Sequence, residues 1–272
     1  MKKEMKNFIL FLVASLLSVF CLTSCLEGSN VYESDTYGVL VYGAKNYSPV
    51  LSTSVGYLSS PNLDALYMRG DLEMGGCYYL YYRHDSDLPE NAPNVVEANG
   101  YSTISLIEYY EVPKFHMNQY LLTDTSSVLP NEIPILETLG IQALVEKNLF
   151  LIQAANQPSE VDLEWDMSYD NTTMMPVTVG DYRYYDIFIR ATKKNSSDKS
   201  SVAMQYLNAY NIGDYLEHVA NTEKTLLGGN YYEMSSKFTI RFNYASDIRG
   251  DTAIVWKNVV WEQYVADYLP RE

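Results

Sequence analysis

Cysteine is scarce in this chain of 272 residues, with three copies in all. Cys21 and Cys25 lie at the end of an N-terminal apolar run, which leaves Cys77 alone in the rest of the sequence. A lone cysteine excludes an intrachain disulfide. Cys77 also has no basic residue or histidine beside it to activate a thiolate. We therefore expect a small buried hydrophobic residue within a strand.

Positive charge is also in short supply. The chain has 19 lysines and arginines against 34 acidic residues, and residues 1–24 hold three of the lysines and one glutamate. The remaining 16 basic and 33 acidic residues give a net charge of −17. Because binding to nucleic acid depends on basic side chains that neutralise phosphates, this balance argues against nucleic acid as a partner.

Catalytic and metal-binding motifs are missing. The three histidines are far apart, and the sequence has no H-E-x-x-H, G-x-S-x-G, glycine-rich phosphate loop or C-x-x-C pair. We therefore predict a protein without catalytic residues, cofactor or metal. Asp162, Glu164 and Asp166 share one strand face, where a solvated surface is favoured over a Ca²⁺ site. A hydrolase that uses two carboxylates remains a less favoured alternative.

The N-terminus does carry a strong signal. Residues 2–6 are lysine-rich and residues 8–22 are almost wholly apolar, as in a secretory signal peptide. The run ends in Leu22-Thr23-Ser24-Cys25, which looks like a bacterial lipobox. We predict a lipoprotein signal peptide over residues 1–24, lipidation of Cys25, and a polar tether over residues 25–36. Acyl chains on Cys25 would then attach the protein to a membrane.

Residues 37–125 predict a small OB-like β-barrel. Strand patterns occur at 37–42, 55–58, 72–82 and 101–112, and a loop of turn-forming residues at 84–100 separates the last two. The chain has 26 tyrosines, and a tyrosine-rich strand face could hold a glycan or a protein partner. We name the loop at 84–100 and three tyrosines as the possible ligand face: Tyr79, Tyr81 and Tyr109.

The second half of the chain predicts an antiparallel β-sandwich over residues 148–272, after a linker at 126–147. Residues 161–169 alternate strictly between apolar and polar, which indicates a half-buried strand, and residues 237–244 alternate in the same way. Residues 212–219 have the spacing of a short amphipathic helix. Residues 261–269 fit either a second such helix, which is favoured, or a final strand.

The layout resembles the NigD-like lipoproteins of Bacteroidota. The resemblance covers the lipobox, the run Gly75-Gly76-Cys77-Tyr78-Tyr79-Leu80-Tyr81-Tyr82, Leu139-Gly140, Asn148-Leu149-Phe150-Leu151 and Asp214-Tyr215-Leu216. It implies an OB-like N-terminal domain followed by a C-terminal β-sandwich. The family carries no established catalytic or ligand residues, so no site residue follows from it.

Together these features predict an all-β, non-catalytic cell-envelope protein. We expect a lipoprotein of the outer membrane, at its periplasmic face or on the cell surface, that binds a glycan or an envelope protein. The alternative is a structural or assembly component, such as a fimbria-associated lipoprotein. That role needs an exposed edge strand that can pair with another chain, for which residues 202–210 are the candidate.

Overall fold

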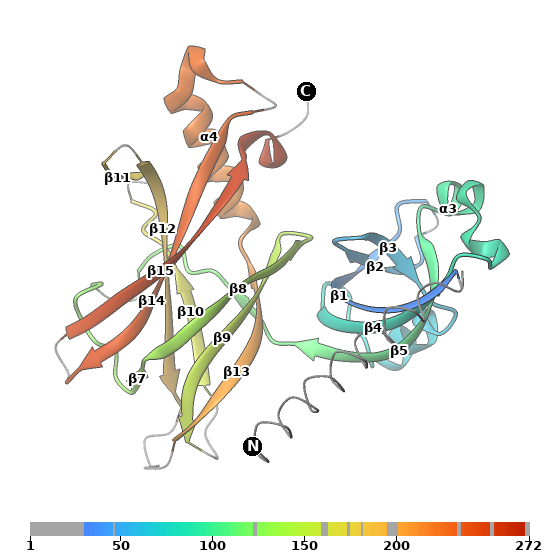
Figure 1. Cartoon of the computed structure of the whole chain (residues 1–272), viewed down its shortest axis with the longest axis horizontal. Coiled ribbons are helices and arrows are strands. Elements are labelled where there is room, and N and C mark those ends of the chain that lie inside the picture. The colour runs from blue at the N-terminus through green and yellow to red at the C-terminus, as the bar shows by residue number, and fades with distance from the viewer. Residues whose placement is uncertain are drawn as a thin grey trace, which may run out of the picture.

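The computed structural model describes two β-rich bodies (Figure 1). The first body ends at Val112 and the second begins at Lys114. We call residues 117–131, which connect the two sheets of the second body, the crossing segment. The described residues are 30–45, 47–121, 124–158, 163–172, 175–180, 182–194, 201–232, 235–250 and 253–269. The predicted signal peptide over residues 1–24, the start of the predicted tether and Cys25 therefore lie outside the described residues. Among the described residues no helix is long and apolar enough to cross a membrane.

The first body is a closed barrel in the strand order β1-β2-β3-β5-β4. Its elements are β1 (Val31–Tyr42), β2 (Pro49–Thr53), β3 (Gly56–Ser59), α2 (Leu63–Arg69), β4 (Cys77–Asp85), a 3₁₀ turn η1 (Pro89–Asn91), α3 (Pro93–Asn99) and β5 (Ser102–Val112). A five-stranded Greek-key barrel of this kind is an OB fold. Its interior is filled by leucines and tyrosines from every strand and from α2: Leu40, Leu51, Leu58, Leu63, Leu72, Tyr78, Leu80, Tyr82 and Ile104.

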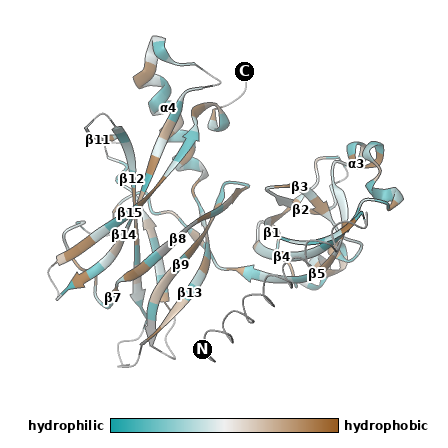
Figure 2. Ribbon diagram, viewed as in Figure 1, coloured by the Kyte–Doolittle hydropathy of each residue, from teal (hydrophilic) through white to brown (hydrophobic). Residues whose placement is uncertain are grey.

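The second body packs two sheets against each other. One has the order β10-β12-β14-β15 with β7 and β11 also on β12, and the other has the order β6-β13-β9-β8. The strands are β6 (Lys114–His116), β7 (Glu132–Ile133), β8 (Ile135–Val145), β9 (Asn148–Pro158), β10 (Leu163–Ser168), β11 (Val177–Val179), β12 (Tyr182–Lys193), β13 (Ser201–Asn211), β14 (Lys237–Arg249) and β15 (Ala253–Tyr264). The mixture of hydrophobic and hydrophilic residues along β14 and β15 is visible in Figure 2. The predicted all-β class, with a barrel before a sandwich, is confirmed.

Two pairings depart from the antiparallel sandwich that the sequence predicts. β12 pairs with β14 in parallel, and β13 pairs with β6 in parallel. The first pairing is possible because β13 and a long helix, α4 (Gly213–Leu227), cross from one strand to the other. The helix contains the predicted amphipathic stretch, and its buried face includes Tyr215, Leu216 and Val219.

The C-terminal segment 261–269 begins as strand and continues as a 3₁₀ turn, and it does not form the favoured amphipathic α-helix. β15 continues to Tyr264, and one 3₁₀ turn, η3 (Val265–Tyr268), follows it. Pairing with β14 explains the difference, because Trp261 lies opposite Ile240 and Tyr264 opposite Lys237. Trp261, Val265, Tyr268 and Leu269 pack on the core of the second body, whereas Tyr264 is exposed.

Three other segments are more regular than the sequence predicts. β1 begins at Val31, inside the predicted tether, because Val31 pairs with Asp85 of β4. The predicted linker at 126–147 contains β7 and the long strand β8, whose pairing with β9 has three register shifts. The predicted loop at 84–100 contains η1 and α3, each with a proline in its first turn. Proline is favoured there because the first amide of a helix has no partner to lose.

The two bodies meet at an apolar interface. The outer face of the barrel and the outer face of the β8–β9–β13 sheet form one buried cluster of Val39, Cys77, Val112, Val145, Phe150 and Ala209. The Phe150 ring lies 5.2 Å from the ring of Tyr37. Burial raises the pKa of the Cys77 thiol to about 11. The expected buried, unreactive Cys77 is therefore confirmed, and it lies at the interface between the two bodies.

Candidate functional site

The three tyrosines of the predicted ligand face do not share one surface. Tyr79 packs beside the interface cluster, with its ring 5.6 Å from Tyr37. The Tyr81 hydroxyl donates to the Glu33 carboxylate at 2.5 Å on the exposed surface. Tyr109 packs against the barrel interior, edge-on to Tyr78. A bulge in β5 explains the inward position of Tyr109. Tyr81 lies opposite Glu108 and Tyr82 opposite Leu106, so the alternation of faces along β5 is inverted after Leu106.

The strand face that OB folds often use for binding is partly covered by the second body. That face is formed by the second and third strands. All five residues of β2 are buried, and the Ser52 hydroxyl donates to the Glu146 carboxylate at 2.8 Å. Glu146 belongs to the turn between β8 and β9. The barrel therefore uses this part of its surface to hold its own neighbour.

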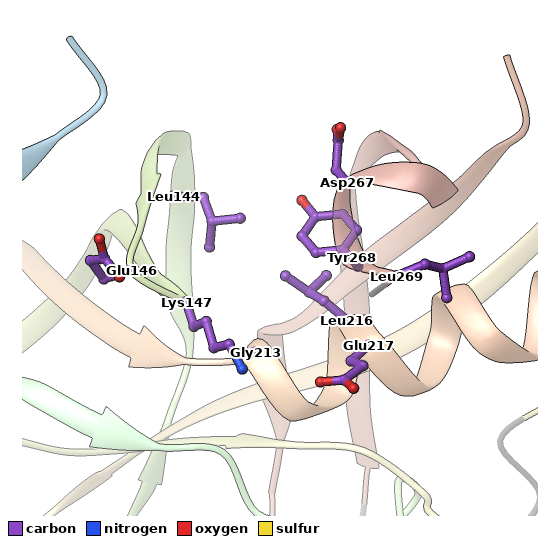
Figure 3. A pocket seen from close by; sticks show the side chains of 9 residues that line it. All are labelled: Leu144, Glu146, Lys147, Gly213, Leu216, Glu217, Asp267, Tyr268 and Leu269. Carbon is purple, nitrogen blue, oxygen red and sulfur yellow. The ribbon is translucent and has the colours of Figure 1, made fainter. Parts of the chain in front are cut away.

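A cavity of about 440 Å³ lies where the β8–β9 turn, the start of α4 and η3 meet (Figure 3). Leu144, Leu216 and Tyr268 face one another across it. Its polar groups diverge, because Glu146 bonds with the barrel and Lys147 lies over Gly213, where a Cβ would be 2.5 Å from the lysine Cβ. No described side chain that lines it has a buried polar atom without a partner. The cavity offers space and little specific chemistry.

Two smaller hollows adjoin each other and contain more polar and aromatic groups. We call the two together the tyrosine cavity. Their volumes are about 260 and 160 Å³, and Tyr169 and Tyr215 line both. Tyr169 follows β10, and Tyr215 lies in the first turn of α4. The larger hollow is also lined by Tyr185, Asp186 and Phe188 of β12, by Asp170, Met175 and Val177, and by Leu121 and Thr125 of the crossing segment. The smaller is also lined by His116, Met117, Gln119, Asn211, Ile212 and Asp214.

Tyr215 is the polar group that the fold leaves unsatisfied in this cavity. Its side chain is 3% exposed, and its hydroxyl has no hydrogen-bond partner among the described residues. Burial raises the pKa of Tyr215 well above its ordinary value, so the hydroxyl stays neutral and keeps its proton. The neighbouring Tyr185 hydroxyl instead donates to buried Glu223 at 2.9 Å. Tyr215 therefore carries a buried hydroxyl proton with no acceptor among the described residues.

The carboxylates of the tyrosine cavity differ in what they hold. Asp186 accepts two bonds from Arg241, at 2.6 and 2.7 Å, and a third from Asn243 at 2.8 Å. Asp170 is exposed, and its Oδ1 accepts bonds from the amide and hydroxyl of Thr172, which lower the pKa of Asp170. Asp186 thus belongs to a structural ion pair, whereas Asp170 keeps one oxygen open and stays ionised.

The predicted solvated face of Asp162, Glu164 and Asp166 is only partly solvated in the structure. Glu164 is exposed as expected, and Asp162 lies outside the described residues. Asp166 is largely enclosed, and its carboxylate accepts a hydrogen bond from Asn118. Burial raises the pKa of Asp166, an effect that the nearby Arg190 partly opposes. The alternation of β10 is right, but the crossing segment at residue 118 covers the outward face.

Arg190 holds the crossing segment against the second body. Its guanidinium is 3% exposed and lies 3.3 Å from the fully buried Glu132 carboxylate. It also donates to the backbone carbonyls of Ser127 and Asp124, at 2.9 and 3.2 Å, and lies over the Trp256 ring. Arg190 thus ties the crossing segment and Glu132 of β7 to strands β12 and β15. Among the described residues no group of three histidine, cysteine, aspartate or glutamate side chains could hold a metal ion.

Sequence reasoning identified Tyr215 only as a core residue of an amphipathic helix, and Tyr169 only as the last inward residue of a strand. Both interpretations are correct for the rings, whose centroids lie 4.7 Å apart with the ring planes tilted by 58°. The unpaired hydroxyl depends on which side chains meet there from α4, β10 and β12. The available hint within the sequence is that Val219, one helical turn after Tyr215, is apolar and offers its hydroxyl no partner.

Comparisons with known proteins support the two-part architecture. Residues 28–110 match a family model described as a lipoprotein OB domain. An uncharacterised protein from Parabacteroides merdae aligns with a TM-score of 0.67 and 17% identity, over 85% of this chain and 99% of its own. A candidate lipoprotein from Bacteroides fragilis aligns with a TM-score of 0.53 and 12% identity, over 86% and 98%. A protein of unknown function from Bacteroides vulgatus aligns with a TM-score of 0.51 and 13% identity, over 88% and 95%.

No curated protein matches this chain. At these identities the solved structures show the fold alone, and they share it along nearly their whole length. The family match supports an OB domain of the lipoprotein type. The narrower NigD-like name depends on the motifs of the sequence and stays a prediction.

Proposed function

We propose that this chain is a non-catalytic lipoprotein of the outer membrane that binds a glycan in the tyrosine cavity. The lipoprotein OB domain match at residues 28–110 and the lipobox at Cys25 support the envelope address. A cavity lined by Tyr169, Tyr185 and Tyr215 offers aromatic faces and a hydroxyl, the combination that suits a sugar ring and its hydroxyl groups. Aromatic walls with a few convergent polar groups are typical of ligand sites.

The observation that carries this proposal is the unpartnered Tyr215 hydroxyl. A buried polar group without a hydrogen bond lowers the stability of the folded protein. Its presence is therefore easier to explain by a role in binding than by a role in folding. A sugar hydroxyl that enters the cavity would accept the missing bond. The neutral state of Tyr215, which burial favours, suits an uncharged hydroxyl.

Tyr215→Phe tests the proposal, because it removes one oxygen and leaves the ring in place. We expect glycan affinity to fall about tenfold, the value of one hydrogen bond, while stability stays equal or rises by up to about 1 kcal/mol. Binding would be measured by calorimetry against oligosaccharides first selected on a glycan array, and stability by thermal unfolding.

Two matched variants separate binding from folding. Tyr185→Phe breaks the bond to buried Glu223 and should lower stability. Tyr182→Phe alters an exposed ring and should change neither property. Unchanged affinity in Tyr215→Phe, with unfolding also unchanged, would contradict a ligand bond at this hydroxyl.

The lipid anchor is tested at its own residue. Cys25→Ala should move the protein from the membrane fraction to the soluble fraction, because acyl chains then no longer hold it. The measurement is fractionation of cells, with the Cys77→Ala variant as the control for loss of a thiol. Retention of Cys25→Ala in the outer membrane would show that another feature anchors the protein.

A second function, as an assembly component, is favoured by one observation. β13 pairs with β9 along its whole length, but β6 covers only residues 209–211 of its other edge. Val202 and Met204 on the remaining part are 58% and 47% exposed. An open, partly apolar edge can pair with a strand of another chain. Recovery of the full protein only as a monomer that joins no polymer would contradict this function.

A further inference from the structure

We infer that the ligand of the tyrosine cavity is an amino sugar that presents a protonated amine. This inference rests on the proposed function, and it names the class of glycan. It comes from the charges that line the two hollows and from the partners that those charges already have.

Every group with a full charge on the lining is acidic. The larger hollow contains Asp170 and Asp186, the smaller contains Asp214, and neither is lined by a described lysine or arginine. The other ionisable lining groups are His116 and the three tyrosines. The net charge of −17 in the predicted mature chain has the same sign. An acidic sugar such as a uronate would therefore meet like charge and no compensating cation.

The charge of Asp186 is already neutralised by its bidentate ion pair with Arg241. The charges that remain for a ligand are Asp170 and Asp214. No described residue forms a salt bridge with either of them, and the Thr172 bonds to Oδ1 of Asp170 leave its second oxygen open. These two carboxylates can each accept a charge-assisted hydrogen bond, which is about twice as strong as a neutral one.

The two open carboxylates belong to the same place as the tyrosine pair. Asp170 directly follows Tyr169 in the chain, and Asp214 directly precedes Tyr215. Asp214 and Tyr169 both line the smaller hollow, and the charge of Asp214 adds to the burial that raises the pKa of Tyr169. A sugar ring against Tyr169 and near the Tyr215 hydroxyl would therefore have carboxylates at its edge. The faces of the aromatic rings favour a cation as well.

The test uses the full lipidated protein in detergent and three probes of equal length: oligomers of glucosamine, of N-acetylglucosamine and of galacturonic acid. We expect the free amine to bind about tenfold more tightly than the acetamide, since a charged hydrogen bond replaces a neutral one. The uronate should not bind. In Asp170→Asn and Asp214→Asn the amine should lose most of this advantage, while affinity for the acetamide is kept.

Asp64→Asn is the control, since Asp64 occupies the first turn of α2 in the other body. It should leave all three affinities unchanged. Equal binding of amine and acetamide, both weakened by Tyr215→Phe, would overturn the amino-sugar inference and leave the glycan site standing. Tighter binding of the uronate would also overturn it. Failure of all three probes and of every array glycan would instead contradict the proposed function itself.

Discussion

Arg190→Met should lower the free energy of unfolding of the second body by about 3–5 kcal/mol, the usual cost of leaving a buried charge without its partner. The Glu132 carboxylate, which is fully buried, then keeps one amide bond from Leu129 and loses its cation. The backbone carbonyls of Asp124 and Ser127 lose their donors too. We therefore expect the crossing segment to detach before the sheets unfold.

Tryptophan fluorescence makes this measurement specific. The chain's three tryptophans, Trp165, Trp256 and Trp261, all lie in the second body. Urea unfolding followed by their emission thus reports on that body alone, and the midpoint, not the intensity, should be compared, because Arg190 lies over the Trp256 ring. Faster proteolysis within residues 118–132 would show that the crossing segment is released.

Two further variants test the cause. Arg190→Met with Glu132→Leu should recover most of the lost stability, since a buried ion pair can often be replaced by apolar side chains at little cost. Arg249→Met removes an arginine from the exposed pair with Asp247 and should have no measurable effect. If Arg190→Met alone were as stable as the natural chain, the buried pair would not be what holds the crossing segment in place.

The parts of the fold that could be predicted are those with one buried and one exposed face. Leu163, Trp165 and Met167 alternate with polar residues, and the strand β10 forms there as expected. β8 escaped prediction because three register shifts against β9 break its period of two. Tyr109 was assigned to the wrong face for the same reason, since one bulge inverts every later residue of β5. Sequence periodicity cannot show a bulge that only the partner strand defines.

The candidate site was less predictable than the fold. The tyrosine composition suggested an aromatic binding surface, but its place on the barrel depended on which faces remain exposed. Tyr79 is covered because the second body packs there. The tyrosine cavity forms from residues as far apart as Leu121 and Tyr215. Such a site depends on tertiary packing, and the sequence indicates its residue types without their arrangement.

The interface between the bodies did leave a mark in the sequence. Val39, Leu40 and Val41 form a continuous apolar run, as do Leu149, Phe150 and Leu151. A strand with an apolar residue at every position is buried on both faces. Leu40 and Leu149 point into the two cores, whereas Val39 and Phe150 meet between the bodies. These runs indicate that the barrel and the sandwich pack directly against each other.

Phe150→Ala should therefore weaken the contact between the bodies, by about 3–5 kcal/mol for a fully buried phenylalanine. The side chain belongs to the interface cluster and touches the Tyr37 ring, so its loss leaves a cavity between two outer faces. We expect the natural chain to unfold in one transition and this variant to unfold in two. Circular dichroism should follow both steps, and tryptophan emission only the step of the second body.

Tyr37→Ala and the double variant complete a cycle that isolates this contact. If the two rings stabilise the interface together, the double variant should cost less than the sum of the single variants, because residues in contact do not contribute additively. Tyr182→Ala, at a ring that is 69% exposed, should leave the transition unchanged. Strict additivity, or one unaltered transition in Phe150→Ala, would mean that the bodies are stable without this contact. In that case the covered barrel face would be available to a partner.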